Sequence, residues 1–284
     1  MRFKISHSLR YSYTARVFIE PMTIRLRPRC NALQHLEYFE LQVEPNPEII
    51  TDNLDIESNC TTTIWLNGMY DNLEVNAKSE VYVPPINPLG FILTEDQVLH
   101  LPANYHRNYL EALEPYLRRR YESPLIDDLV NPILAKSKGE TNSFLLNLST
   151  EIHEQFSKES REMGDARSPH ETLTSHSGAC RDLALLYMEC CRSVGLAARF
   201  VSGYGCREDV DQLKRQHTHA WAEIYLPGGG WRGFDPSIGL AVSDQHVAVA
   251  SAADPENAAP TSGKFRGTNV QSHLTYDVNI QCSG

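Results

Sequence analysis

Long apolar runs, an excess of positive charge and CxxC motifs are all missing from this 284-residue sequence. No segment approaches the roughly 18 apolar residues of a membrane-spanning helix, so we expect no membrane partner. The net charge of -10 argues against a nucleic-acid partner, because phosphate recognition needs a basic surface. The first ten residues contain no apolar segment typical of a signal peptide, so we expect a cytoplasmic location.

The seven cysteines are an odd number and are scattered along the chain. This pattern is not typical of a disulfide framework. In a reducing compartment, most of them are expected to be small buried hydrophobic residues. Cys190 and Cys191 lie on a predicted core helix, whereas Cys30 and Cys60 are isolated.

The length of the chain favours two domains. In residues 1–83, short alternating apolar segments and turn signals predict a β-sandwich-like N-terminal domain. Prolines at the start of residues 84–105 predict a linker. Residues 106–284 contain helical and strand patterns, which predict an α+β core with helices packed on an antiparallel sheet.

Helical patterns begin at about residue 107, and three helices are predicted in the stretches that follow. One spans residues 129–136 with Pro132 in its first turn, and another spans residues 144–156. The third follows Gly178, where apolar residues recur at helical spacing up to Gly195, a suitable C-terminal cap. Cys180 therefore lies in the first turn of a core helix, where free N–H groups and the helix dipole lower the pKa of a thiol.

A strand is predicted over residues 218–226, where apolar and polar residues alternate. The glycine-rich turn at residues 227–230 predicts a hairpin with the segment that ends at Asp235. Counting back from this turn places Asp235 diagonally across from His219. We therefore expect the two side chains to lie close together.

A cysteine, a histidine and an aspartate in these places are typical of nucleophilic catalysis. Cys180 would attack a carbonyl carbon, His219 would carry its proton, and Asp235 would orient the imidazole. The backbone N–H of Cys180 would stabilise the oxyanion, together with a second donor that the sequence does not assign.

Each of these residues also has a plain structural interpretation, as a core cysteine or a surface hairpin residue. Trp221 and Tyr225 share the predicted face of His219 and form either a wall of the substrate cleft or part of the core. Gly178 would leave room for substrate beside the sulfur. Asp182 lies two residues beyond Cys180 and is expected to cap the helix.

A metal site is a further interpretation of this stretch. His217, His219 and Cys206 are possible ligands, but Cys206 has no CxxC partner and zinc sites usually need four ligands. We therefore expect no metal and no cofactor.

The stretch resembles the transglutaminase-like superfamily, in its bacterial cysteine-protease-like branch. The resemblance rests on four motifs: Gly178–Ala184, Gly195–Tyr204, His219–Tyr225 and Trp231–Pro236. The β-rich start is similar to the N-terminal domain of these bacterial proteins, and residues 247–280 resemble their closing segment. A Gly-Asn turn expected near residues 55–59 is missing. The resemblance implies a papain-like core with Cys180, His219 and Asp235 as its triad, and it does not imply calcium dependence.

The chemistry implied by the resemblance is acyl transfer through a thioester. Water as acceptor makes the protein a cysteine protease or amidase that acts on a peptide or protein substrate, and this is our main hypothesis. An amine as acceptor makes it a transglutaminase. A non-catalytic scaffold on the same fold is the third hypothesis, against which the complete triad argues. Nothing in the sequence indicates the oligomeric state.

Overall fold

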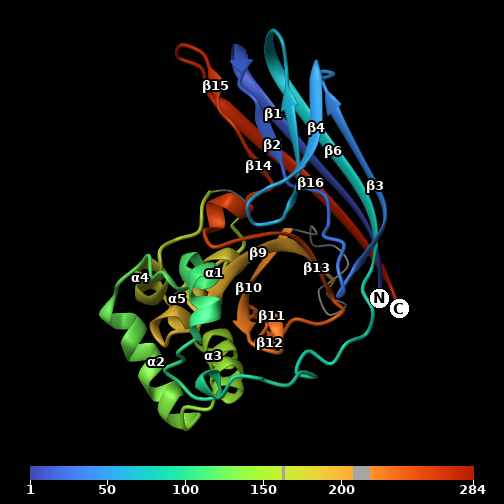
Figure 1. The fold of residues 1–284 in the computed structure, drawn as a ribbon. Helices are drawn as coiled ribbons and strands as arrows, with labels where there is room; N and C mark the ends of the chain where they lie inside the picture. Colours follow the sequence, from blue (N-terminus) through green and yellow to red (C-terminus); the bar gives the residue numbers. More distant parts are fainter. Residues whose placement is uncertain (162–163, 207–217) are drawn as a thin grey trace.

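The computed structural model describes residues 1–161, 164–206 and 218–284. A region of long strands stacks on a mixed region, in which helices cover one side of a smaller sheet (Figure 1). This arrangement confirms the predicted α+β fold, with a sandwich-like β region and helices packed on an antiparallel sheet. Among the helices of the described residues, none is both long and apolar enough to cross a membrane.

The larger sheet of the β region has the strand order β15-β1-β6-β3, and β16 also pairs with β1. Alternate residues of β1 are buried, as its sequence predicted, because one face of the sheet packs on the interior. Val75 and Val81 belong to the single long strand β6. The strands are β1 (Arg2–Ile19), β3 (His35–Glu44), β6 (Met69–Tyr82), β15 (Phe265–Arg266) and β16 (Ser272–Ser283).

The second sheet has the order β14-β2-β5-β4. Its inner residues form one apolar cluster with those of the larger sheet, including Ile24 and Ile64 against Leu73 and Val75. The turn at Asn67-Gly68 joins the two sheets, and Gly68 has a φ of +142°. The strands are β2 (Met22–Ile24), β4 (Ile49–Leu54), β5 (Cys60–Trp65) and β14 (Thr261–Ser262).

The last strands of the chain return to the first. Arg2 is opposite Ser283 and Tyr13 is opposite Ser272 along the antiparallel pair β1–β16. The N- and C-termini therefore lie side by side (Figure 1). The proposed division into residues 1–83, 84–105 and 106–284 stays a prediction, and in space the end of the chain completes the β region.

The segment between the two regions packs along the core. The Thr94 N–H donates to the Pro227 carbonyl (3.0 Å), and the Ala103 N–H donates to the Val194 carbonyl (2.8 Å). The Tyr105 hydroxyl donates to the Tyr225 carbonyl at 2.7 Å. A short 3-10 helix, η1 (Asp96–Val98), lies within this segment.

The core sheet has the order β12-β11-β10-β9-β13, and helix α5 packs on β10 and β9. Leu183, Leu186 and Tyr187 of α5 are fully buried, as the helical spacing predicted. The strands are β9 (Ala198–Gly205), β10 (Thr218–Leu226), β11 (Gly230–Asp235), β12 (Leu240–Ala241) and β13 (His246–Ala252). The remaining elements are α1 (Arg107–Leu117), α2 (Pro124–Lys136), α3 (Thr141–Gln155), β7 (Ser157–Lys158), α4 (Pro169–Ser175), β8 (Ser177–Gly178), α5 (Cys180–Ser193) and η2 (Pro255–Ala258).

The predicted start of the helix near residues 129–136 is wrong. Helix α2 begins at Pro124, which follows the N-cap residue Ser123, and Pro132 lies inside it. Both prolines are preceded by residues suited to a helix start, and the earlier one begins the helix because Ile126 and Val130 are already buried in the core.

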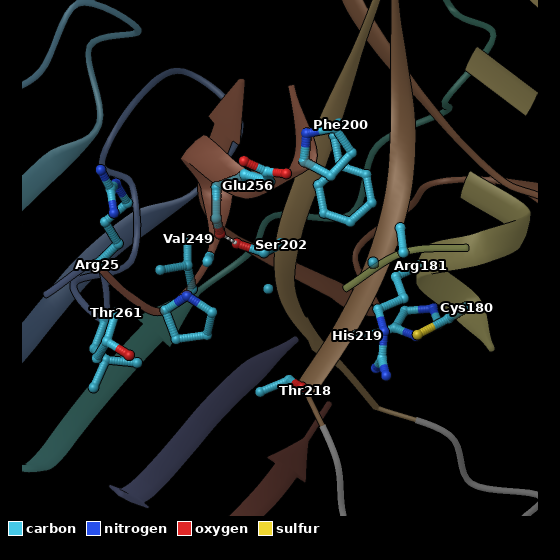
Figure 2. Close-up of a pocket in the computed structure, with 18 of the residues that line it drawn as sticks. Arg25, Cys180, Arg181, Phe200, Ser202, Thr218, His219, Val249, Glu256 and Thr261 are labelled. Carbon is cyan, nitrogen blue, oxygen red and sulfur yellow. Dashed lines mark hydrogen bonds between the residues drawn. The ribbon is translucent and has the colours of Figure 1, made fainter. Parts of the chain in front are cut away.

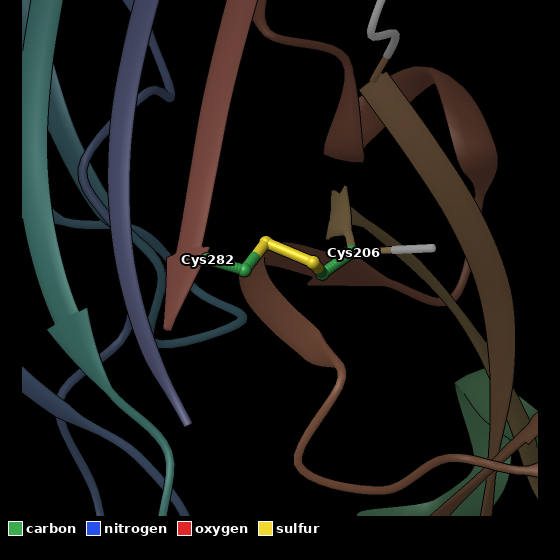
Figure 3. Close-up of a disulfide and its surroundings, with 2 residues drawn as sticks. All are labelled: Cys206 and Cys282. Carbon is green, nitrogen blue, oxygen red and sulfur yellow. A yellow bond between two sulfur atoms is a disulfide. The ribbon is translucent and has the colours of Figure 1, made fainter. Parts of the chain in front are cut away.

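The expectation that the cysteines form no disulfide is also wrong for one pair. Cys206, directly after β9, is bonded to Cys282 of β16, so the bond joins the core to the β region (Figure 3). The two residues are 76 positions apart in sequence, a separation from which no pairing can be read. Cys190 and Cys191 are buried free thiols, as predicted.

Candidate active site

Cys180 is the first residue of α5, as the sequence predicted. Its side chain is partly buried beside His219, and both line a cavity between the core and the β region (Figure 2). The Ala220 N–H donates a hydrogen bond to the sulfur. The thiol therefore combines access to the cavity with donors that stabilise its negative charge.

Asp182 fixes the turn that carries Cys180. One of its carboxylate oxygens accepts the Ala179 N–H (2.8 Å), and the other accepts the Arg167 N–H (2.8 Å) and pairs with Arg161. The Asp182 side chain is fully buried, and a Cβ on Gly178 would lie 2.9 Å from its Cβ. Asp182 therefore has the capping role expected of it, and Gly178 gives it space.

His219 and Asp235 lie close together, as expected from the predicted hairpin. Phe234 is opposite Ala222, so the next residue, Asp235, reaches toward His219 on β10. The distance between His219 Nε2 and Asp235 Oδ2 is 2.5 Å. A hydrogen bond also links His219 to Cys180, which leaves Nδ1 as the ring nitrogen that faces the sulfur.

The charges of the three residues are coupled. Burial opposes ionisation of Cys180, but the hydrogen bond and charge of His219 outweigh it and lower the pKa of the thiol. Burial opposes protonation of His219, but Asp235 raises the pKa of the imidazole well above its ordinary value. His219 and His246 hold the pKa of Asp235 well below its usual range, against the effect of burial. These three pKa shifts favour a thiolate–imidazolium pair with an ionised aspartate.

The sequence analysis missed His246, which is a second imidazole on the same carboxylate. His246 begins β13, is buried, and its Nε2 lies 3.2 Å from Asp235 Oδ2. The other oxygen, Oδ1, accepts the backbone N–H (2.9 Å) and hydroxyl (2.7 Å) of Ser237. The only signal in the sequence was a histidine at the start of a weak strand pattern, so the contact could not be found without the fold.

The three residues predicted to form the cleft lie outside the cavity at Cys180, as far as the described lining residues show. Trp221 is buried, and its ring packs edge-on against His246 at 5.2 Å. Tyr225 lies near the opposite end of β10 from His219, and its ring packs against Trp231 and Tyr109. Trp221 and Tyr225 therefore fit the core interpretation of this strand, and Gly178 fits a backbone role.

The structure gives no support to a metal site formed by His217, His219 and Cys206. His217 lies outside the described residues, and Cys206 is bonded to Cys282 in a disulfide. Three possible ligand atoms, from His219, Asp235 and His246, lie within 4.8 Å of one another. Their short imidazole–carboxylate contacts are those of hydrogen bonds, so we assign the cluster to charge stabilisation rather than to a metal.

The fold and the site together define a class of protein. A thiol on the first turn of a core helix faces a histidine and an aspartate on two neighbouring strands of an antiparallel sheet. Residues 127–236 match the family model of the "Transglutaminase-like superfamily", and residues 3–82 match that of the "Bacterial transglutaminase-like N-terminal region". The chain belongs to the transglutaminase-like superfamily.

Two mycobacterial relatives and one solved structure match nearly the whole chain. An uncharacterized protein of Mycobacterium tuberculosis is 24% identical over 299 residues, covering 98% of this chain and 92% of the relative. An uncharacterized protein of Mycobacterium leprae is 22% identical over 271 residues, covering 94% of each. A solved structure from Cytophaga hutchinsonii, described as a candidate cysteine protease, is 20% identical with a TM-score of 0.69 and covers 100% of this chain and 92% of its own. This last likeness shows a shared fold.

Proposed function

We propose that the protein is a cysteine hydrolase that cleaves peptide or amide bonds with Cys180, His219 and Asp235. The observation that carries the proposal is the hydrogen-bonded series from thiol to imidazole to carboxylate at the edge of a cavity. A series of this kind activates a thiol and holds the proton that a leaving amine needs.

The first half of the reaction forms a thioester. The Cys180 thiolate attacks the carbonyl carbon of the substrate, and the backbone N–H of Cys180 stabilises the oxyanion. The C–N bond then breaks, and the amine leaves with the proton that it takes from the His219 imidazolium.

The second half releases the acyl group. His219, now neutral, takes a proton from water, and the hydroxide attacks the thioester carbon. The C–S bond breaks, a carboxylic acid leaves, and the thiolate–imidazolium pair is restored. A primary amine in place of water gives transamidation through the same thioester.

Two further observations support the enzymatic interpretation. Two imidazoles hold the pKa of buried Asp235 well below its usual range, and a carboxylate charge is costly to bury without a function. The Cytophaga hutchinsonii protein of similar fold is described as a candidate cysteine protease, in keeping with water as the acceptor.

The proposal is tested with a fluorogenic peptide library and, in parallel, a labelled primary amine with a glutamine-containing protein. We expect peptide hydrolysis in excess of amine incorporation, and none of either in Cys180→Ala. Asp235→Asn is expected to lower kcat about 10⁴-fold, because the amide selects the wrong imidazole tautomer. Amine incorporation well above hydrolysis would mean a transglutaminase, and neither reaction would favour a scaffold.

The proposal includes the cytoplasmic location expected from the sequence, and the redox state of Cys206 and Cys282 tests it. In the expected cytoplasmic location, cellular reductants keep Cys206 and Cys282 as thiols, whereas their disulfide is typical of an oxidising compartment. Free thiols can be alkylated in intact cells before lysis and counted by mass spectrometry. Alkylation of the half-buried Cys206 and Cys282 agrees with the cytoplasm, and their protection contradicts it.

A further inference from the structure

The cavity at Cys180 is walled by both regions of the molecule. It measures about 320 Å³ and reaches from Cys180 and His219 to Arg25 and Thr261, which lie on the opposite side of the close-up (Figure 2). Pockets that bind small ligands begin at roughly 300 Å³, so this one can take part of a peptide. On the side of the β region it is lined by strands β1 and β16 of the larger sheet and by Thr261 of β14 in the second sheet.

The walls of this cleft are mainly apolar. The β region contributes Leu9 of β1 with Leu274 and Tyr276 of β16, and these share one face because Leu9 is opposite Tyr276 in the register. The core contributes Phe200 of β9 and Val249 of β13. An apolar side chain that enters the cleft therefore contacts both regions.

The polar groups of the cleft that lie away from the thiol are largely occupied. Arg25 is paired with Asp55 at 3.6 Å and also donates to the Ser262 hydroxyl at 3.0 Å. The Ser202 hydroxyl donates to the Ala258 carbonyl at 2.6 Å. Thr261 shares a hydrogen bond with the Tyr11 hydroxyl. Because these partners lie within the protein, the three side chains offer little to a charged substrate group, and the lining carboxylates, Asp165 and Glu256, belong to exposed residues.

We infer that the substrate is a peptide with a bulky apolar side chain, such as Leu, Met or Phe, beside the cleaved bond, and that the β region forms the specificity wall. The inference rests on the proposed hydrolase function and names its substrate class. Burial of such a side chain against Leu274 and Phe200 supplies binding energy in proportion to the apolar area removed from water.

Leu274 gives a sharp test, because it is half-buried in the cleft while its neighbour Thr275 is exposed on the other face of β16. In a peptide library randomised on both sides of the bond, the parent protein should prefer apolar residues. Leu274→Lys should lower kcat/KM for those peptides about tenfold or more through KM, since tenfold corresponds to the loss of one favourable apolar contact. Leu274→Ala should shift the preference toward larger aromatic residues, and Thr275→Lys should change neither.

The rate at which iodoacetamide alkylates Cys180 separates the two possible failures. This rate should be equal in all four proteins, because the small reagent does not fill the cleft. Cleavage without an apolar preference, or an unchanged preference in both Leu274 variants, would overturn the inference alone. No cleavage of any peptide by a parent protein with a reactive Cys180 would overturn the proposed function and the inference with it.

Discussion

Asp235 Oδ2 lies within hydrogen-bond reach of two imidazoles, those of His219 and His246, and this shared oxygen is the centre of the site at the residue scale. His219 also contacts the thiol, whereas His246 is buried behind it against Trp221. His246 therefore acts on the chemistry through Asp235, as a positioning residue that orients the carboxylate and holds it ionised.

Replacement of His246 tests this role. His246→Phe keeps a ring against Trp221 but removes the donor, so we expect kcat to fall about tenfold, the equivalent of a hydrogen bond to a charged group worth roughly 1.5 kcal/mol. His246 helps to lower the pKa of Asp235, so its loss raises that pKa. Asp235 then becomes protonated at a higher pH, and the acid limb of the kcat profile moves to higher pH.

His246→Gln is the matched control, since its amide N–H can replace the imidazole donor. We expect it to restore the acid limb toward that of the parent protein. If the acid limb of the kcat profile is unchanged in His246→Phe, the positioning role is contradicted and His246 serves only in packing.

Helix α5 and strand β10 are the elements that set the site, and both were predictable from the sequence. The alternation over residues 218–226 gave the bounds of β10, and the apolar stripe after Gly178 gave α5. Local patterns sufficed here because both elements bury one face against the same core. Helix α2 was misplaced because Pro132 looks like a helix start, and only burial of the preceding turn shows that the helix begins earlier.

The first turn of α5 depends on Asp182. Asp182→Ala removes the acceptor of the Ala179 N–H and leaves Arg161 without its buried partner. We expect a loss of about 3 kcal/mol in the free energy of unfolding, as for other broken buried ion pairs, measured by urea denaturation. Asp128→Ala, on the exposed side of α2, is the control and should change stability by less than about 0.5 kcal/mol. Equal effects of the two substitutions would contradict the capping role.

At the scale of the whole molecule, the contacts between the two regions could not be predicted. The resemblance indicated a closing segment over residues 247–280, but not that its last strand pairs with β1. Nor did it predict that Leu274 faces the cleft or that Cys282 meets Cys206. Each of these contacts joins residues far apart in the chain, and the sequence pattern of one strand does not indicate which strand pairs with it.

The disulfide between the regions should stabilise the oxidised protein. A bond that closes a loop of 76 residues restricts the unfolded chain, so we expect Cys282→Ser to lower the free energy of unfolding by about 2–4 kcal/mol. Denaturant titrations with and without reductant measure the effect. Reductant should destabilise the parent protein by a similar amount and leave Cys282→Ser unchanged. Insensitivity of the parent protein to reductant would contradict a structural disulfide.

The central claim is that His219 keeps Cys180 as a thiolate, and the rate of Cys180 alkylation as a function of pH tests it most directly. The measurement compares the parent protein with His219→Ala by peptide mass spectrometry. Because His219 lowers the pKa of the thiol, the parent should react well below the ordinary thiol pKa of about 8.5. His219→Ala should lose this reactivity and react only at higher pH, since burial alone raises the pKa. Superimposed curves that rise only near pH 8.5 or above would show that the thiolate–imidazolium pair does not form.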